Sequence, residues 1–317
     1  MAVVVTGSAG FIGRHLVALL AARGLVVVGI DRRPGTPADA VELRADLVDA
    51  PAGGPYDDAL AEADAVFHLA GRPGARDPGP GGWPAGELAR LRRRDNVLAA
   101  ERVLARVRPE VPLVVVSSSS VYGGAGQGGG RPSRETDPLR PLGGYARSKV
   151  AVERRCAARV AVGGLVAVAR PFTVAGEGQR PDMAVARWLD AAARGEPLRV
   201  LGGLDRRRDL TDVRDVAAGL LRLAERAVTG PVNLGTGTAH TLGDLVAAVG
   251  AAVGVLPQVA VLPVGPEDPA ATLADTARCR RRLGFVPRTD LPALVRRQAV
   301  AAGLAVTGPG PVLLEAL

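Results

Sequence analysis

The sequence predicts an α/β fold, in which a doubly wound parallel sheet carries helices on both faces and is joined to a smaller C-terminal lobe. In the first half of the chain, short apolar runs alternate with longer amphipathic segments, the pattern of successive βαβ units. After Arg170-Pro171 the segments become shorter and richer in glycine and proline, which indicates the smaller lobe. With 317 residues, 47% of them hydrophobic, the chain is long enough to bury a sizeable core.

The period of the apolar residues predicts each element in turn. Apolar runs too short for helices predict strands at residues 3–5, 25–30, 65–69, 113–117 and 165–169. Apolar residues at helical spacing predict covering helices at residues 11–23, 87–108 and 145–162. Strands and helices therefore alternate, as a doubly wound sheet requires.

Composition argues against several classes of protein. The first residues show no basic stretch before an apolar run, and no segment reaches the length of a membrane span, so we expect a cytoplasmic protein without a membrane partner. Cys156 and Cys279 are the only cysteines. They are too few for a disulfide framework and lack metal-ligand spacing, which agrees with a reducing compartment and indicates no metal site.

The net charge of +8 raises the question of a nucleic-acid partner. However, the arginine runs at residues 92–94, 206–208 and 280–282 are scattered, and no aromatic residues interleave with them to stack on bases. We therefore expect solvated faces and no nucleic-acid partner.

Lys149 is the only lysine in the chain, although lysine and arginine together number 40. An ammonium group is a compact charge whose pKa responds readily to its surroundings, whereas a guanidinium stays charged. A lysine kept in this arginine-rich background therefore indicates a chemical role.

A glycine-rich segment lies directly between the first predicted strand and the first predicted helix: Thr6-Gly7-Ser8-Ala9-Gly10-Phe11-Ile12-Gly13. Three glycines at this place permit a tight turn and let the backbone approach a pyrophosphate at the helix N-terminus. The second predicted strand ends at Asp31, whose carboxylate would accept hydrogen bonds from the adenosine ribose hydroxyls. Together these features predict a Rossmann-type domain that binds a nicotinamide dinucleotide.

Asp31 favours NAD over NADP, because its charge would repel a 2′-phosphate. The adjacent Arg32 and Arg33 leave NADP open, since an arginine can hold that phosphate. We expect NAD. On this interpretation residues 1–171 form the NAD-binding domain, with a returning segment near 212–238, and residues 172–211 and 239–317 form a substrate-binding lobe.

A second constellation joins serines at a strand end to a Tyr-Lys pair on the next helix. Ser117 to Ser120 follow the strand, and Tyr145 and Lys149 are four residues apart, so the pair shares one helix face. The cation can lower the pKa of the phenol toward working pH, and Lys149 can also hydrogen-bond the nicotinamide ribose. These residues predict a site for proton transfer coupled to redox chemistry.

Further stretches complete a resemblance to a known family: Asp46-Leu47, His68-Leu69-Ala70-Gly71, Asn96-Val97, Arg170-Pro171-Phe172, Arg208-Asp209-Leu210-Thr211-Asp212-Val213, Asn233-Leu234-Gly235 and Ala274-Asp275-Thr276. In this order they resemble the markers of the extended short-chain dehydrogenase/reductase family, the NAD-dependent epimerases and dehydratases of nucleotide sugars. The resemblance runs from Val3 to about Pro287.

The resemblance implies roles for individual residues. It implies a catalytic role for Ser118, Tyr145 and Lys149. It implies contacts to NAD from Gly7, Gly10, Phe11, Ile12, Gly13, Asp31, Arg32, Asp46, Leu47, Leu69, Ala70, Gly71, Asn96, Ser117, Tyr145, Lys149 and Pro171. It also implies a homodimer.

The positions after Ser118 separate the subgroups of this family. Sugar-nucleotide 4,6-dehydratases carry Asp-Glu where this chain has Ser119 and Ser120, and UDP-glucuronate decarboxylases carry Glu at the second position. Serine cannot perform that acid–base work. Thr173, in place of the usual Asn, resembles the UDP-glucuronate 4-epimerases, as does the run Arg180-Pro181-Asp182-Met183-Ala184.

This closer resemblance implies a substrate and a mechanism. UDP-glucuronic acid would become UDP-galacturonic acid by transient oxidation at C4, rotation of the 4-keto intermediate and re-reduction. Arg180 and Arg208 would hold the diphosphate. Neutral donors would hold the C5 carboxylate out of alignment for loss of CO2. In this chain those donors are Ser118, Ser119, Ser120 and Thr173.

Two departures from the family pattern keep other activities open. Ala175 stands where the family usually has Tyr, and Gly265 stands where many members have an Arg for the diphosphate. The alternatives are a UDP-glucose/UDP-galactose 4-epimerase, a nucleotide-sugar 4-ketoreductase and, from another class, a non-catalytic NAD(P)-sensing protein. The presence of Ser118, Tyr145 and Lys149 argues against the last.

Overall fold

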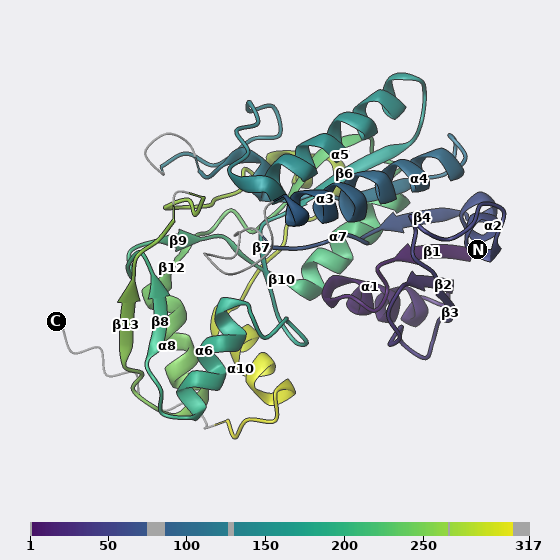
Figure 1. Ribbon diagram of the computed structural model, residues 1–317. Helices are drawn as coiled ribbons and strands as arrows, with labels where there is room; N and C mark the ends of the chain where they lie inside the picture. Colours follow the sequence, from purple (N-terminus) through teal and green to yellow (C-terminus); the bar gives the residue numbers. More distant parts are fainter. Residues whose placement is uncertain (1, 75–85, 126–129, 266, 307–317) are drawn as a thin grey trace.

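The computed structural model describes residues 2–74, 86–125, 130–265 and 267–306. At its centre is a seven-stranded parallel sheet with the strand order β11-β6-β5-β4-β1-β2-β3 (Figure 1). Its strands are β1 (Ala2–Thr6), β2 (Val26–Asp31), β3 (Val41–Arg44), β4 (Ala65–His68), β5 (Leu113–Val116), β6 (Val166–Pro171) and β11 (Gly230–Leu234). The order reverses between β1 and β4, where the carboxyl ends of the strands leave a crevice. The predicted doubly wound parallel sheet is confirmed.

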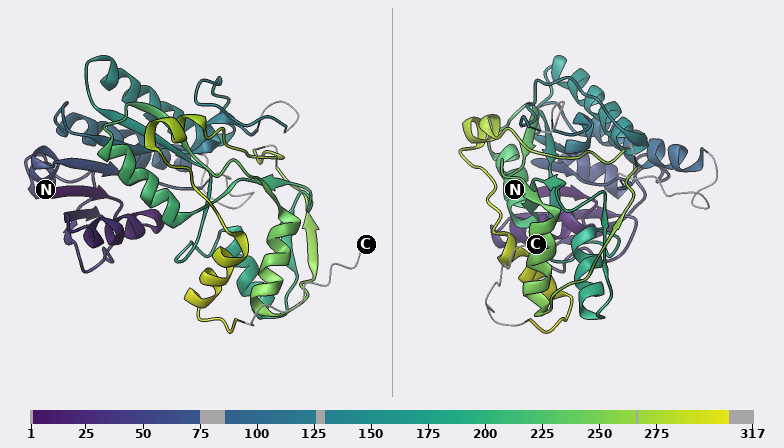
Figure 2. Two further views of the ribbon diagram at one scale, coloured as in Figure 1. Left: turned by 180° about the vertical axis from the view of Figure 1, so that it is seen from behind. Right: turned by 90° about the vertical axis from the view of Figure 1, so that its left-hand side faces the viewer.

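Helices cover both faces of the sheet, and each face has its own apolar core. Helices α1 (Phe11–Ala22), α7 (Val213–Glu225) and α9 (Ala277–Leu283) lie on one face. The other face carries α2 (Pro55–Glu62), α4 (Ala99–Arg106) and α5 (Gly143–Ala161). Figure 2 shows this layering in its right-hand view, with α7 and α9 on one side of the sheet and α4 and α5 on the other.

Several elements of this domain have no counterpart among the predicted strands and helices, namely β3, α2, α7, β11 and α9, and one predicted helix is divided. Strand β3 at the sheet edge is mostly exposed and α2 is short and acidic, so neither carries a clear apolar period. The predicted helix at residues 87–108 consists of α3 (Glu87–Arg92), a π-helical turn η1 (Arg93–Leu98) and α4. π-Helical turns occur frequently at functional sites.

A second group of elements packs around a separate core beyond the carboxyl ends of the strands (Figure 1). It contains α6 (Ala184–Ala193), α8 (Leu242–Val253), α10 (Leu291–Ala301) and the parallel pair β8 (Leu198–Leu201) and β13 (Val259–Leu262). Its connections to the sheet include the short pairs β7–β10 and β9–β12, formed by Thr173–Ala175, Leu210–Asp212, Arg207–Arg208 and His240–Thr241. Residues 307–317 of the predicted lobe lie outside the described residues.

Ion pairs tie this second group to the sheet domain. Arg297 of α10 pairs with Glu177, which follows β7, at 2.9 Å, and it also pairs with Asp212, the N-cap residue of α7. The backbone oxygen of Glu177 lies 2.8 Å from Nε2 of His15 on α1. The segment between β7 and α6 is therefore fixed against both α1 and α10.

Within the described part of the chain, no helix is long and apolar enough to cross a membrane. No three His, Cys, Asp or Glu side chains gather there as ligands for a metal ion.

Candidate active site

The turn between β1 and α1 forms a cradle that only glycine fits. Gly7 adopts a φ of +76°, and a Cβ atom built there would lie 2.7 Å from the backbone nitrogen of Ala70. A Cβ on Gly10 or Gly13 would lie 2.9 or 2.1 Å from the backbone oxygen of Gly7. The backbone at the start of α1 is therefore bare, as close approach of a pyrophosphate requires. The residues present fit a dinucleotide.

Asp31 at the end of β2 is buried and held by two backbone nitrogens. Its carboxylate oxygens accept hydrogen bonds from Ala9 at 3.2 Å and from Arg33 at 2.9 Å. The first of these bonds fixes Asp31 against the glycine turn. The contact of this carboxylate with the adenosine ribose stays a prediction.

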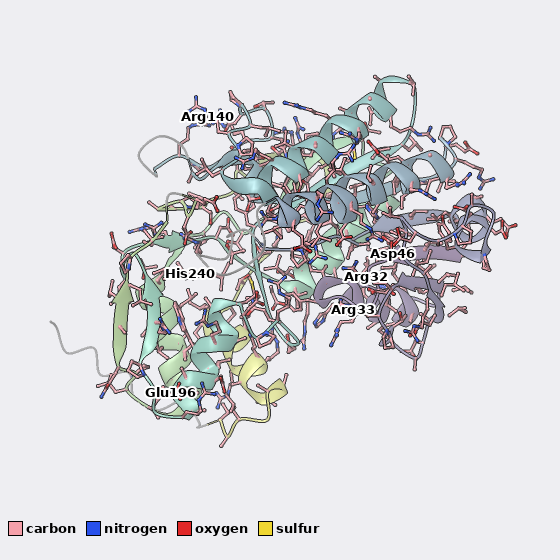
Figure 3. The ribbon with its side chains drawn as sticks, in the orientation of Figure 1. Arg32, Arg33, Asp46, Arg140, Glu196 and His240 are labelled. Carbon is pink, nitrogen blue, oxygen red and sulfur yellow. The ribbon has the colours of Figure 1, made fainter. Side chains whose placement is uncertain are left out.

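Arg32 is shared between two carboxylates beside this point. It pairs with Asp95 at 3.4 Å and with Asp46 at 3.7 Å, and Figure 3 shows it next to Asp46. Burial acts to raise the pKa of Asp46, but hydrogen bonds from Val48 and Arg94 outweigh it and lower that pKa. Asp46 therefore stays ionised, and Arg32 is engaged by acids rather than presented alone to a 2′-phosphate.

One cleft of about 1430 Å³ runs from the glycine turn along the strand ends into the second group of elements. Such a volume exceeds that of an ordinary drug-sized pocket and suits two large ligands end to end. The residues expected to act in catalysis, to bind NAD or to bind the substrate line this cleft with one exception, although they come from segments far apart in the chain.

The exception is Asn96, which lies behind the wall of the cleft. It is fully buried in the π-helical turn, and its side-chain nitrogen donates to Ser148 of α5 at 2.8 Å. Its side-chain oxygen accepts from the backbone nitrogen of Arg72 at 2.6 Å. Asn96 therefore holds α5 and the segment after β4 together, and its contact with NAD stays a prediction.

Tyr145 is half-buried at the start of α5, and its phenol hydrogen-bonds Ser118 at the end of β5. Burial raises the pKa of Tyr145, while the hydrogen bond with Ser118 and the charges of Arg180 and Arg92 act to lower it. The net direction is upward, so the predicted lowering by Lys149 is not what the structure shows. The Nζ atom of Lys149 lies 5.9 Å from the centre of the Tyr145 ring.

Lys149 is buried one helical turn further along α5. Its Nζ atom donates to the backbone oxygen of Val116 at 2.9 Å. Burial lowers the pKa of Lys149 to about 8, and the negative charge of Glu153 opposes that effect. Burial, together with the Lys149 charge, lowers the pKa of His68 to about 3, so this neighbour stays neutral.

Several hydroxyl groups line the cleft, among them that of Ser118, which hydrogen-bonds Tyr145. Ser119 and Ser120 belong to a short 3₁₀ turn, η2 (Ser119–Tyr122), that Ser118 caps by accepting from the backbone nitrogen of Ser120 at 3.1 Å. The Ser120 hydroxyl is buried and finds no hydrogen-bond partner within the described part of the chain. Thr173 lines the same cleft from β7. A buried hydroxyl without a partner is costly unless a ligand satisfies it.

Arg180 and Arg208 also line the cleft. Arg180 makes two parallel hydrogen bonds of 2.8 Å to its neighbour Asp182. Arg208 donates to Asp268 at 2.6 Å. Both guanidiniums are present where an anion would enter, each held by an acidic side chain.

A buried polar network behind the site was missed in the sequence analysis. Glu153 of α5 accepts from Ser117 at 2.5 Å and from Arg170 of β6 at 2.6 Å. Arg170 also donates to Tyr122 at 2.8 Å, and Tyr122 donates to Asn233 of β11 at 2.6 Å. The only available signal was the four-residue spacing of Glu153 from Lys149, which placed it on the same helix face.

Known proteins resemble this chain over nearly its full length. The chain is 36% identical to MoeE5. MoeE5 has been solved in complex with UDP-glucose and NAD, and in complex with UDP-glucuronic acid and NAD. Each of these structures superposes on this chain with a TM-score of 0.83 and covers 96% of this chain and 99% of MoeE5. A UDP-glucuronic acid 4-epimerase from Bacillus cereus, solved with UDP-glucuronic acid and NAD, is 25% identical at a TM-score of 0.85, with the same coverage. The dTDP-6-deoxy-L-talose 4-dehydrogenase (NAD(P)(+)) of Kitasatospora kifunensis is 32% identical over 93% of each chain.

Residues 3–235 match the NAD dependent epimerase/dehydratase family. This range spans β1 to β11 and includes the glycine cradle, the Tyr-Lys pair and the hydroxyl groups beside it. The family expected from the sequence, and NAD as its cofactor, are confirmed at this level. The chain belongs to the NAD dependent epimerase/dehydratase family.

Proposed function

We propose that the protein is a nucleotide-sugar 4-epimerase that interconverts UDP-glucuronic acid and UDP-galacturonic acid with bound NAD. The observation that carries this proposal is the group of neutral hydroxyls beside Tyr145, with the Ser120 hydroxyl buried and unpartnered in the described chain. Serine at positions 119 and 120 leaves no carboxylate at the two positions where dehydratases and decarboxylases carry one for proton transfer. The carboxylate of a uronic acid would offer an acceptor to these hydroxyls, including that of Ser120, which has no partner among the described residues.

Tyr145 acts as the base that takes the proton of the C4 hydroxyl, and Ser118 orients that hydroxyl. Their hydrogen bond supports this pairing. Lys149 holds the nicotinamide ribose and is anchored from behind by the backbone of Val116. NAD, when bound, supplies the hydride acceptor at C4 and returns the hydride to the other face of the sugar. Tyr145 then returns the proton.

Neutral donors keep the reaction from becoming a decarboxylation. Oxidation at C4 makes a β-keto acid, which loses CO2 when the breaking bond aligns with the carbonyl. Hydrogen bonds from Ser119, Ser120 and Thr173 to the carboxylate hold it out of that alignment and supply no proton. The same hydroxyls have less to bind in a neutral hexose, so a uronic acid is the better fit.

The second group of elements, within residues 172–211 and 239–317, serves as the substrate lobe in this proposal. Arg180 and Arg208 reach into the cleft from it and bind the diphosphate, for which paired guanidinium donors are suited. The charge of Arg180 also acts on Tyr145, so this arginine lies toward the reacting end.

The test is to incubate purified protein with UDP-glucuronic acid, without added cofactor, and to follow the sugar by proton NMR. The expected result is UDP-galacturonic acid without UDP-pentose, and Tyr145→Phe should lose about 10³-fold in kcat. UDP-pentose as the main product would refute the role of the hydroxyls. No reaction with UDP-glucuronic acid, combined with turnover of UDP-glucose, would make the protein a hexose epimerase; MoeE5 has been solved with that ligand as well.

A further inference from the structure

Asp95 is a buried carboxylate in the π-helical turn η1 that lines the cleft and lies among three guanidiniums. Arg94 donates to its Oδ1 atom at 2.6 Å, and Arg72, from the segment after β4, donates to its Oδ2 atom at 2.9 Å. Arg32, directly after β2, donates from its two terminal nitrogens to the two carboxylate oxygens, each at 3.4 Å. One buried acid therefore gathers arginines from three segments of the chain.

Arg32 is the most exposed arginine of this group and the most distant from Asp95. Its side chain is 46% exposed, against 23% for Arg72 and 25% for Arg94. Its second ion pair among the described residues is with Asp46, at 3.7 Å. Asp46 lies closer to Arg94, at 3.0 Å. Arg32 is therefore the arginine of this group that a ligand in the cleft could take over.

The position of Arg32 says which ligand group would compete for it. Arg32 follows Asp31, whose carboxylate is expected at the adenosine ribose, and both residues line the cleft. An arginine at this place can hold the 2′-phosphate that distinguishes NADP from NAD. A phosphate would accept two parallel hydrogen bonds from the guanidinium, as the carboxylate of Asp95 does now.

We propose that Asp95 is a specificity-determining residue, which holds Arg32 away from a 2′-phosphate and so favours NAD over NADP. Its action differs from that of Asp31. Asp31 repels the phosphate directly, whereas Asp95 occupies the guanidinium that would bind it. The inference concerns the cofactor alone, so it does not depend on which sugar is converted.

Asp95 is better suited to this role than the other charged groups nearby. It contacts both terminal nitrogens of Arg32, and its burial leaves its charge poorly screened by water. Asp46 is 25% exposed and makes one longer ion pair to Arg32. Arg33 is 67% exposed and pairs with Asp31 at 3.7 Å, so it would remain available to a phosphate in every variant of Asp95.

The test is an exchange of the bound nucleotide in the purified protein. The protein is equilibrated with known mixtures of NAD and NADP, freed of unbound nucleotide and denatured, and the released dinucleotides are quantified by chromatography. Their ratio gives the affinity for NADP relative to NAD without any turnover. Asp95→Asn keeps the shape of the side chain and removes its charge. It should raise this relative affinity by about tenfold, the effect of one hydrogen bond to a charged group.

Two further variants show whether the gain passes through Arg32. In Asp95→Asn combined with Arg32→Gln, most of the gain should be lost, because no guanidinium is left to be released. Asp49→Asn is the matched control. It removes one negative charge from an exposed residue that pairs with Arg94 of the same group, and it should leave the relative affinity unchanged.

The outcomes decide the inference in each case. Folded Asp95→Asn without a rise in relative affinity for NADP would overturn it. A rise that persists in the double variant, or that Asp49→Asn equals, would mean that net charge alone is responsible and would also overturn it. If Asp95→Asn does not fold, Arg32→Gln alone decides. Its relative affinity should match that of the parent, and a fall of about tenfold would show that Arg32 already serves the phosphate.

Discussion

The two ends of the cleft are built differently. At the cofactor end, the backbone of the glycine turn forms the surface, and the polar side chains have several fixed partners, as Asp31 and Arg32 do. At the substrate end, side chains form the surface. Arg180 is paired with the exposed Asp182, two residues further along the chain, and the Ser120 hydroxyl is unpartnered in the described residues.

This difference suits two ligands with different lifetimes. A surface of fixed backbone groups needs no rearrangement to bind, so it suits a cofactor that emerges unchanged from each cycle, as the proposed epimerase requires. Side chains that must exchange partners suit a substrate that enters and leaves in every turnover. Substitutions at the cofactor end should therefore abolish the binding of NAD, whereas substitutions at the substrate end should alter which nucleotide sugar is converted and which product is formed.

The largest effect is expected at the cofactor end, from Gly13→Ala. Its Cβ would lie 2.1 Å from the backbone oxygen of Gly7, so the turn must shift. We expect protein that purifies without NAD, and a free energy of unfolding lower by about 1–3 kcal/mol. Released nucleotide and chemical denaturation measure both. Gly54→Ala is the matched control, because its Cβ would lie an ordinary 3.6 Å from Pro51. Full NAD content in Gly13→Ala would contradict the view that the rigid backbone of the glycine turn forms the cofactor-binding surface.

The next effect concerns Lys149, where the two ends meet. Its pKa lies at about 8, so the ammonium is present below that pH and lost above it. The kcat/KM of the parent should therefore fall as the pH rises through about 8. Lys149→Arg should be about 100-fold slower, because the guanidinium does not match the compact ammonium, and its rate should lack this alkaline fall. An identical alkaline fall in the variant would assign that titration to another group.

At the substrate end, Thr173→Val keeps the shape of the side chain and removes one hydroxyl. A hydrogen bond to a charged acceptor contributes about 1.5–3 kcal/mol. Loss of this bond should raise the ratio of UDP-pentose to UDP-galacturonic acid by about tenfold, while NAD content stays at the parent level. Thr238→Val, at an exposed position outside the cleft, is the control. An unchanged product ratio would remove Thr173 from the carboxylate site.

The smallest effect is expected from Asp182→Asn. The Arg180–Asp182 pair is partly exposed, and such pairs contribute about 0.2–1 kcal/mol. Without this competitor Arg180 is freer to bind a diphosphate, so KM for the nucleotide sugar should fall by about two- to threefold. Glu110→Gln breaks a similar exposed pair, with Arg108, away from the cleft and should leave KM unchanged. A higher KM in Asp182→Asn would mean that the aspartate orients Arg180 for its ligand.

The sequence predicts most of the central sheet because its strands are buried on both faces and read as unbroken apolar runs. It does not reveal β3, which lies at the sheet edge with most of its residues exposed, so that no burial enforces a pattern. The sequence of residues 87–108 predicts one continuous helix and does not reveal its π-helical turn, because the spacing of apolar residues does not report a change of hydrogen-bond register within a helix.

The site was predictable where the chemistry needs rare residues at short spacing, as in the glycine turn and the Tyr-Lys pair. It was not predictable where the decisive property is the burial of a common residue. Arg92 and Arg170 are two of the many arginines in this chain, and only the fold reveals that both are buried. The sequence also does not reveal the bonds of Asn96 to Ser148 and Arg72, since a motif position does not state which way its side chain points.

Lys149 is the only lysine of the chain, and it is a buried residue that lines the cleft. Isotope labelling with lysine alone would therefore give a spectrum with a single side-chain signal, and that signal would originate inside the site. The protein thus carries an intrinsic reporter, with which the binding of each ligand and the loss of the ammonium proton could be followed without a dye, a tag or a substitution.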